Sequence, residues 1–144
     1  MEPYPHRYAV RAGGAPEGSV ALESQGLPSL SSAAPAEFGG PGDQWSPETL
    51  LVAAVADCFI LTFRAIATAS KFAWGRVECR AEGVVDRRDG KPQFTELRLH
   101  ATLTVPEGAN VERAERLLEK AEQTCLVTNS LKATPTLTVE ISYL

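Results

Sequence analysis

The chain has little positive charge and no run of lysine and arginine residues. It carries 14 Lys and Arg against 18 Asp and Glu among 144 residues, which gives a net charge of −4 at pH 7. Because nucleic acid binding requires a basic face for the phosphates, we expect no nucleic acid partner. The only two histidines, His6 and His100, have no ligand spacing to any cysteine. We therefore expect no metal site, and nothing in the sequence indicates a cofactor.

The cysteines are few and odd in number: Cys58, Cys79 and Cys125. Three cysteines do not form the closed disulfide framework of a small secreted domain. The first residues, Met1 to Arg7, lack the apolar core of a secretion signal. We therefore expect the protein in the reducing cytoplasm.

A long apolar helix is predicted to follow Ser46. That serine is a good N-cap, Pro47 suits the first helical position, and Glu48 favours the positive end of the helix dipole. The helix is long enough to span a membrane, but Asp57 and Arg64 interrupt it, and charges at mid-bilayer are costly. We interpret it as the buried central helix of a soluble protein, with no membrane partner.

The remaining pattern alternates between strands and one further helix. Short alternating runs predict strands, and one amphipathic stripe predicts the helix. The strands are expected at residues 8–12, 19–24, 77–83, 94–105 and 136–143, and the second helix at 110–124. The pair Asp89-Gly90 predicts a hairpin turn. This order of elements is α+β, and a hydrophobic content of 44% suits a single domain over residues 1–144.

Cys79 lies on the apolar side of its predicted strand, with Val77 and Ala81. Because a free cysteine behaves as a small hydrophobic residue, we interpret Cys79 as core packing. His100 falls on the polar face of the next strand and, like His6, is interpreted as a solvated side chain.

Cys58 and Cys125 stand at more distinctive places. Cys58 lies near the middle of the long helix, and Cys125 opens the short segment 125–131 after the second helix. A thiol peroxidase needs a thiolate and a second thiol that resolves the sulfenic acid. Backbone N–H groups at the start of a short helix would favour a thiolate at Cys125, whereas Cys58 needs a neighbouring cation or donor. Spacing in sequence does not show proximity, so a redox pair and two inert buried cysteines both stay open.

Residues 46–59 resemble the motif of the OsmC/Ohr family. In that family a Pro-Glu pair, here Pro47-Glu48, starts a long buried helix. A peroxidatic cysteine followed by Phe lies ten residues after the Glu, here Cys58-Phe59.

The family's second cysteine also has a counterpart. It heads a short segment that contains Ser or Thr and a Leu-Lys-Ala run, here Cys125, Thr128 and residues 131–133. The order of elements agrees with the family from about residue 18 to residue 141, so the resemblance covers most of the chain.

The resemblance implies an intertwined α+β homodimer, with a long buried central helix packed on antiparallel sheet and active sites at the subunit interface. It implies a cysteine-based peroxidase that reduces organic hydroperoxides or hydrogen peroxide, as an antioxidant in the oxidative stress response. Cys58 would be the peroxidatic thiol, Cys125 the resolving thiol in a Cys58–Cys125 disulfide, and Glu48 part of the activating network. A dithiol, for example of the lipoyl type, would then reduce the disulfide.

Two positions depart from the family pattern. The hydroperoxide-reducing members have an Arg in the early hairpin, where this chain has Ala15, and that Arg would pair with the Glu and favour the thiolate. Arg11 is the nearest substitute. Leu126 stands where the family usually has Pro. The alternative reading is therefore a non-enzymatic relative that binds a small apolar ligand at the dimer interface.

The long helix gives its own reason to expect a dimer. A helix that is apolar on nearly every side needs more cover than one short chain supplies. Ten residues of helix also separate Glu48 from Cys58 by about 15 Å along the axis. We therefore expect no contact between them within one chain, so that Glu48 serves the thiol of the other subunit or acts through a loop.

Overall fold

The structure, a computed structural model, describes all residues from Met1 to Leu144. The chain divides into two compact units, Met1–Leu50 and Leu51–Leu144, and the boundary falls within the first turns of one long helix, α1 (Pro47–Ala69). The expectation of one domain over the whole chain stays a prediction.

The first unit is a small antiparallel sheet followed by one helical turn. Its strands are β1 (Arg11–Gly13), β2 (Val20–Glu23) and β3 (Leu30–Ser32), in that order, and the turn is η1 (Ala36–Phe38). The expected strand at residues 8–12 begins late, because Tyr8 and Val10 are exposed with nothing to cover them. Strand β3 was not predicted, since its three residues are too short to show an alternating pattern.

The start of α1 is where the sequence predicts it. The backbone N–H of Thr49 donates to Ser46 Oγ at 3.1 Å, and the backbone N–H of Ser46 donates to Thr49 Oγ1 at 2.8 Å. These reciprocal bonds satisfy donors that a helix start otherwise leaves free. Ser46 is buried, so the cap fixes the first turn of α1 firmly.

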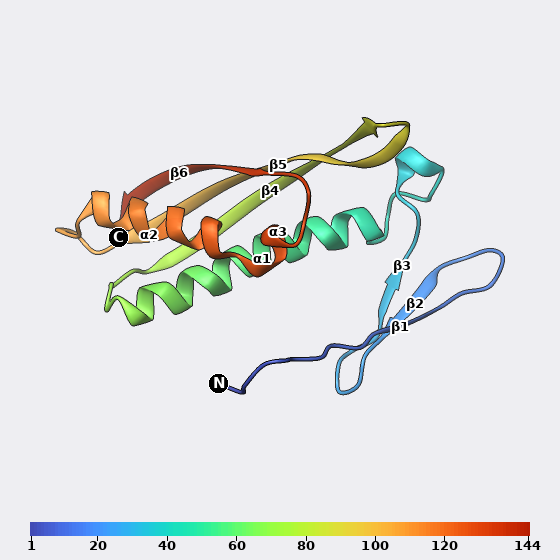
Figure 1. Cartoon of the computed structure of the whole chain (residues 1–144), viewed down its shortest axis with the longest axis horizontal. Helices are drawn as coiled ribbons and strands as arrows, with labels where there is room; N and C mark the ends of the chain where they lie inside the picture. Colours follow the sequence, from blue (N-terminus) through green and yellow to red (C-terminus); the bar gives the residue numbers. More distant parts are fainter. The chain divides into compact units, whose positions relative to one another are not determined.

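The second unit has a three-stranded sheet and helices on one of its faces (Figure 1). The strands are β4 (Arg76–Arg88), β5 (Lys91–Val105) and β6 (Pro135–Tyr143), in the order β4-β5-β6. The hairpin between β4 and β5 turns at Asp89 and Gly90, whose φ angles of 55° and 75° fit the predicted Asp-Gly turn.

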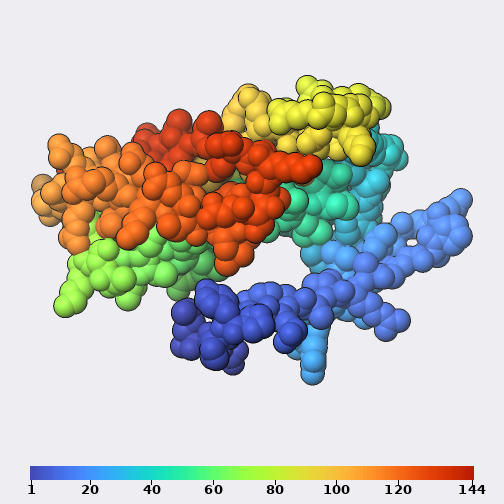
Figure 2. All heavy atoms as spheres, in the orientation of Figure 1, coloured from blue at the N-terminus to red at the C-terminus, as the bar shows by residue number.

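The sheet differs in one respect from the antiparallel sheet that was expected, because β6 runs parallel to β5. Parallel neighbours need a crossover connection, and the helices α2 (Val111–Thr124) and α3 (Leu126–Asn129) supply it. The α2 helix packs against β6, and Figure 2 shows the atoms of these two elements adjoining without a gap. The α+β class itself is confirmed.

The core of this unit lies between the sheet and the helices. Most of the core comes from three elements. The helices α1 and α2 each contribute one side, with core residues three or four positions apart, and β5 contributes every second residue. The buried residues of these elements are Val55, Phe59, Phe63, Ala67, Leu97, Leu99, Ala101, Leu103, Val105, Ala114, Leu117, Leu118 and Ala121.

The opposite side of α1 is not covered by the sheet or the other helices of this unit. Within the most apolar 18-residue window of the helix only 22% of the residues are buried, and Leu61 is 51% exposed. By length and composition α1 would also be able to cross a membrane, a weak test that the core helix of a soluble protein passes as well. An apolar helix exposed on one side marks a surface for a partner.

Candidate active site

Cys58 lies on α1 beside the core residue Phe59 and is half-buried. Its sulfur is 3.8 Å from the hydroxyl of Thr62, one helical turn further along. Residues four positions apart share a side of the helix, which explains why this hydroxyl reaches the sulfur.

Cys125 occupies the junction between two helices. It is the C-cap of α2 and the N-cap of α3, and its side chain is only 1% exposed. Its carbonyl accepts the backbone N–H of Asn129 at 3.0 Å and the hydroxyl of Thr128 at 3.2 Å. These bonds hold the single turn of α3 directly after the cysteine.

The fold brings these two cysteines together. Cys125 and the backbone N–H groups of Leu126 and Val127 lie close enough to the Cys58 sulfur to lower the pKa of Cys58 by hydrogen bonding. The start of α3 therefore points at Cys58. Backbone N–H groups at the start of α3 act on both thiols. Those of Leu126 and Val127 lower the pKa of Cys58, and that of Thr128 lowers the pKa of Cys125, as expected, but does not outweigh the effect of burial there.

These contacts give the two thiols opposite properties. Burial alone would raise the pKa of Cys58, but hydrogen bonds from the Cys125 thiol, the Val127 N–H, the Thr62 hydroxyl and the Leu126 N–H outweigh it and lower that pKa. Burial raises the pKa of Cys125, and its hydrogen bond to Cys58 raises it further. Cys58 is the thiol that more readily becomes a thiolate, and Cys125 keeps the proton.

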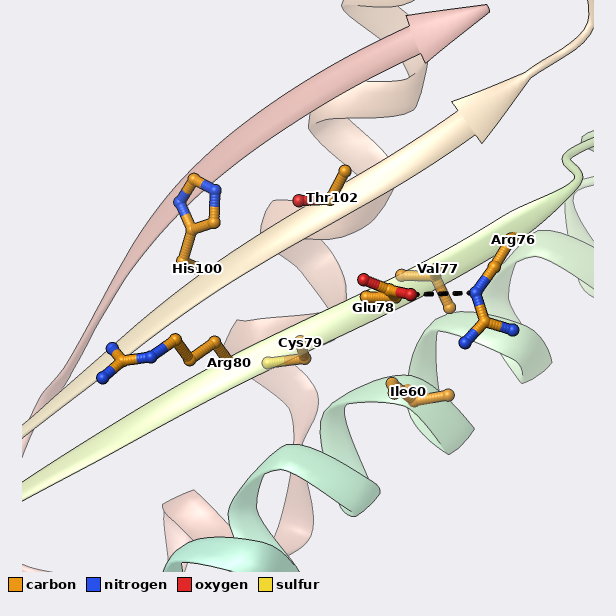
Figure 3. Close-up of a pocket in the computed structure, with 8 residues that line it drawn as sticks. All are labelled: Ile60, Arg76, Val77, Glu78, Cys79, Arg80, His100 and Thr102. Atoms are coloured by element: carbon orange, nitrogen blue, oxygen red, sulfur yellow. Dashed lines mark hydrogen bonds and ion pairs between the residues drawn. The ribbon is translucent and has the colours of Figure 1, made fainter. Parts of the chain in front are cut away.

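Cys79 has the inert character that the sequence predicts. It packs against the core from β4, and Figure 3 shows it near Ile60 of α1, at an open pocket of about 410 Å³. Burial, followed by the charge of a nearby Cys125 thiolate, raises the pKa of Cys79 to about 11. At neutral pH this cysteine is therefore a protonated thiol.

Glu48 belongs to the first unit and borders a largely apolar pocket there. The pocket has a volume of about 490 Å³, and its lining residues are Ala12, Val20, Leu22, Ser32, Ala33, Ala34, Pro35, Phe38, Pro47, Glu48 and Leu50. The Oε1 atom of Glu48 is buried and has no hydrogen-bond partner within the chain. A carboxylate oxygen in this condition is costly and calls for a donor from outside the chain.

Arg11 is not placed to serve as that donor. On β1, Ala12 lines the pocket directly opposite Leu22 of β2, while Arg11 is paired with Glu23. Neighbouring residues of a strand point to opposite faces, so Arg11 faces away from the pocket. Ala15, at the position of the family Arg, is exposed and carries no charge.

Glu48 and Cys58 lie on the same unbroken helix, ten residues apart. The rise of an α-helix separates them by about 15 Å along the axis. The structure therefore brings Cys58 and Cys125 together and leaves Glu48 of the same helix apart from them.

Two features of the site have only weak signals in the sequence. Thr62 is detectable as a hydroxyl four residues after Cys58, whereas the N–H groups of Leu126 and Val127 leave no trace in residue type.

His100, interpreted as a solvated side chain, lies on the polar face of β5 with Nδ1 2.7 Å from Thr138 Oγ1 and Nε2 3.5 Å from a carboxylate oxygen of Glu140. It takes no part in the site.

The comparisons with known proteins concern the family and the fold. An uncharacterized protein of Bacillus subtilis, YmaD, is 26% identical over 111 residues, which cover 75% of this chain and 74% of YmaD. An OsmC-like protein of unknown function from Vibrio cholerae has a similar structure, with a TM-score of 0.87 at 16% identity over 94% of this chain and all of that one.

A third comparison is with a solved structure of higher sequence identity. The structure of an organic hydroperoxide resistance protein OsmC from Legionella pneumophila matches with a TM-score of 0.76 at 28% identity, over 97% of this chain and 99% of that one. The family model of the OsmC-like proteins matches residues 40–140, a range that contains both cysteines and Glu48. The chain therefore belongs to the OsmC-like protein family.

Proposed function

We propose that this protein is a thiol peroxidase that reduces organic hydroperoxides or hydrogen peroxide. The observation that carries the proposal is that Cys58 lies beside Cys125 and the start of α3, where hydrogen bonding lowers the pKa of Cys58 while the pKa of Cys125 is raised. Such donors stabilise the thiolate, which is the nucleophile in peroxide reduction. The Legionella relative, described as an organic hydroperoxide resistance protein, supports this substrate class.

In the first step the Cys58 thiolate attacks the terminal oxygen of the hydroperoxide. The O–O bond breaks, the sulfur is oxidised to a sulfenic acid, and the alkoxide takes up a proton and leaves as the alcohol. Cys58 is half-buried, so the core does not enclose it completely.

In the second step Cys125 attacks the sulfur of the sulfenic acid. A Cys58–Cys125 disulfide forms and water leaves. The opposite effects of the two thiols on each other's pKa support this pairing, since thiols that interact in this way lie near each other. An external dithiol, for example of the lipoyl type, then returns both cysteines to thiols and is itself oxidised to a disulfide.

The active form in this proposal is a cytoplasmic homodimer. The exposed apolar side of α1 supports a partner subunit, and so does the buried Glu48 oxygen without a donor. Because about 15 Å of helix separates Glu48 from the Cys58 of its own chain, Glu48 would act at the thiol of the other subunit.

A second candidate function is the binding of a small apolar ligand without catalysis. The largely apolar pocket beside Glu48 and the absence of an arginine at position 15 favour it. Ligand binding does not require a reactive Cys58, so the reaction of Cys58 with a hydroperoxide distinguishes the two candidate functions.

The deciding experiment is a stopped-flow titration of the reduced protein with cumene hydroperoxide, followed by a count of free thiols. The peroxidase proposal expects the three free thiols to fall to one after one equivalent of peroxide. The matched control is Cys79→Ser, which should still lose two thiols. Three thiols that survive excess peroxide would reject the peroxidase and favour the binding protein.

A further inference from the structure

The hydroxyl of Thr62 contacts the reactive sulfur and not the backbone of its own helix. A hydroxyl in a helix commonly donates to the carbonyl four residues earlier, as those of Thr124 in α2 and Ser130 after α3 do, at 2.7 Å and 2.8 Å. Thr62 instead has its Oγ1 atom 3.8 Å from the Sγ atom of Cys58. The hydroxyl is therefore placed where it can act on the chemistry of that sulfur.

Thr62 differs from the other donors around Cys58 because its O–H group can turn. The backbone N–H groups of Leu126 and Val127 are fixed by the first turn of α3, whereas a hydroxyl rotates about its C–O bond and can change its acceptor. The Cys125 thiol also rotates, but S–H is a weaker donor, and its sulfur is the nucleophile of the second step. Thr62 is thus a strong donor beside Cys58 that is free to follow a moving charge.

Peroxide reduction moves a negative charge from one atom to another. The charge is on the Cys58 sulfur before the attack, and it passes to the leaving oxygen while the S–O bond forms and the O–O bond breaks. A donor that stays on the sulfur stabilises the starting thiolate more than the transition state, whereas a donor at the leaving oxygen lowers the barrier. A donor that reaches both atoms serves both stages.

We propose that the Thr62 hydroxyl is a catalytic donor, which hydrogen bonds to the Cys58 thiolate before the reaction and to the leaving oxygen of the peroxide as the O–O bond breaks. The inference rests on the peroxidase of the proposed function and adds a residue to its first step. The thiolate takes the terminal oxygen and becomes a sulfenic acid, and the other oxygen leaves as an alkoxide. Thr62 keeps its own proton throughout, and water protonates the alkoxide.

The position of the hydroxyl suits both contacts. The sulfur and the two peroxide oxygens lie roughly in line when the O–O bond breaks. A peroxide that approaches over Thr62 brings both oxygens past a hydroxyl that lies 3.8 Å from the sulfur, within reach of a hydrogen bond of about 2.7–2.8 Å. Cys58 and Thr62 are both half-buried, so the core encloses neither side chain completely.

The test compares the rate constant of the thiolate itself in wild type and in Thr62→Val, both in a background with Cys79→Ser. Stopped-flow consumption of cumene hydroperoxide gives the rate constant at each pH, and thiolate absorbance at 240 nm gives the ionised fraction of Cys58. Dividing the first by the second removes any effect of the substitution on the pKa. We expect Thr62→Val to lower the rate constant per thiolate about tenfold or more, because a hydrogen bond to a charged oxygen is lost from the transition state.

A donor that only stabilises the thiolate predicts the opposite sign. Thr62→Val would then raise the pKa of Cys58 and give a more basic thiolate, which is the better nucleophile. The rate constant per thiolate would be unchanged or higher, and that result overturns the proposal. Thr62→Ala, a better helix former than valine, repeats the comparison if Thr62→Val does not fold.

Two variants and one reagent are the controls. Thr62→Ser keeps a hydroxyl and should recover most of the wild-type rate constant per thiolate, and Thr68→Val, about 15 Å from Cys58 along α1, should leave it unchanged. Iodoacetamide alkylates the same thiolate with loss of iodide, which needs no hydrogen bond to leave. Thr62→Val should therefore be alkylated per thiolate at least as fast as wild type, and equal slowing of alkylation and of peroxide reduction overturns the proposal.

The same measurements keep this proposal apart from the peroxidase itself. A wild-type protein that consumes no cumene hydroperoxide rejects the peroxidase, and this step with it. A wild-type protein that consumes peroxide, with a Thr62→Val variant equally fast per thiolate, rejects only the role of Thr62.

Discussion

Cys58 and Cys125 lie together, and hydrogen bonding between their thiols lowers the pKa of Cys58 and raises that of Cys125, so the two cysteines hold their protons unequally. Two segments far apart in the sequence, the middle of α1 and the junction of α2 with α3, create this relationship. It assigns the nucleophile and the proton-bearing thiol of the pair before any substrate arrives.

The first prediction concerns this hydrogen bond. In Cys125→Ala the donor is lost, and we expect the pKa of Cys58 to rise, because the donor stabilises only the thiolate form. Thiolate absorbance at 240 nm, followed from pH 5 to pH 10, measures the change in a background with Cys79→Ser. If the pKa of Cys58 is the same in Cys125→Ala as in the protein with Cys125, then Cys125 has no part in the ionisation of Cys58.

The second prediction concerns the backbone donors at the start of α3. Leu126→Pro introduces the residue that the family usually has, but it removes one N–H group from Cys58, and this chain has no arginine at position 15 to compensate. Proline suits the first position of a helix, so the turn should stay intact. The loss of one hydrogen bond of about 1 kcal/mol predicts a roughly fivefold slower reaction with cumene hydroperoxide at pH 7. Leu126→Ala keeps the N–H and is the control, expected at the wild-type rate.

Local features of the fold were predictable because neighbouring residues determine them. Ser46 and Pro47 define the start of α1 through a cap that involves only the first turn. The turn at Asp89 and Gly90 follows from the left-handed backbone that these residue types tolerate. Each of these features depends on contacts within a few residues.

Long-range relationships were not predictable from the pattern. The parallel direction of β6 depends on how α2 and α3 cross the sheet, and an alternating run reads the same in either direction. The proximity of Cys58 and Cys125 was open from spacing alone and came only with the family resemblance. The direction in which Arg11 points depends on the register of β1 against β2, which no single strand reveals.

The third prediction concerns the oxidation product. One equivalent of cumene hydroperoxide should give a Cys58–Cys125 disulfide and leave Cys79 free, because only the first two thiols contact each other. Cys58→Ser should abolish peroxide consumption, whereas Cys125→Ser should complete one turnover and stop at a sulfenic acid. Peptide mapping by mass spectrometry identifies the linkage. A disulfide that contains Cys79 would contradict the proposed order of steps.

The last prediction concerns stability at alkaline pH. Folding raises the pKa of Cys79 from its ordinary value of 9.0 to about 11, chiefly through burial. Between these values the unfolded chain loses its proton while the folded chain keeps it, so the unfolded state binds fewer protons and stability falls as the pH rises. The stabilising contribution is complete below pH 9 and disappears toward pH 11. After a discount for the partial exposure of the side chain, we expect the loss to be on the order of 1 kcal/mol.

Urea unfolding at pH 8 and pH 10.5 measures this loss, in wild type and in Cys79→Val. Valine fits the apolar side of β4 and has no proton to lose, so the variant should lose less of its free energy of unfolding between the two pH values. Cys58→Ser is the matched control. The pKa of Cys58 is lowered on folding rather than raised, so removing this thiol should not reduce the alkaline loss. If wild type and Cys79→Val lose the same free energy of unfolding between these pH values, other groups cause the alkaline sensitivity. Cys79 would then be less deeply buried in solution than its packing against the core implies.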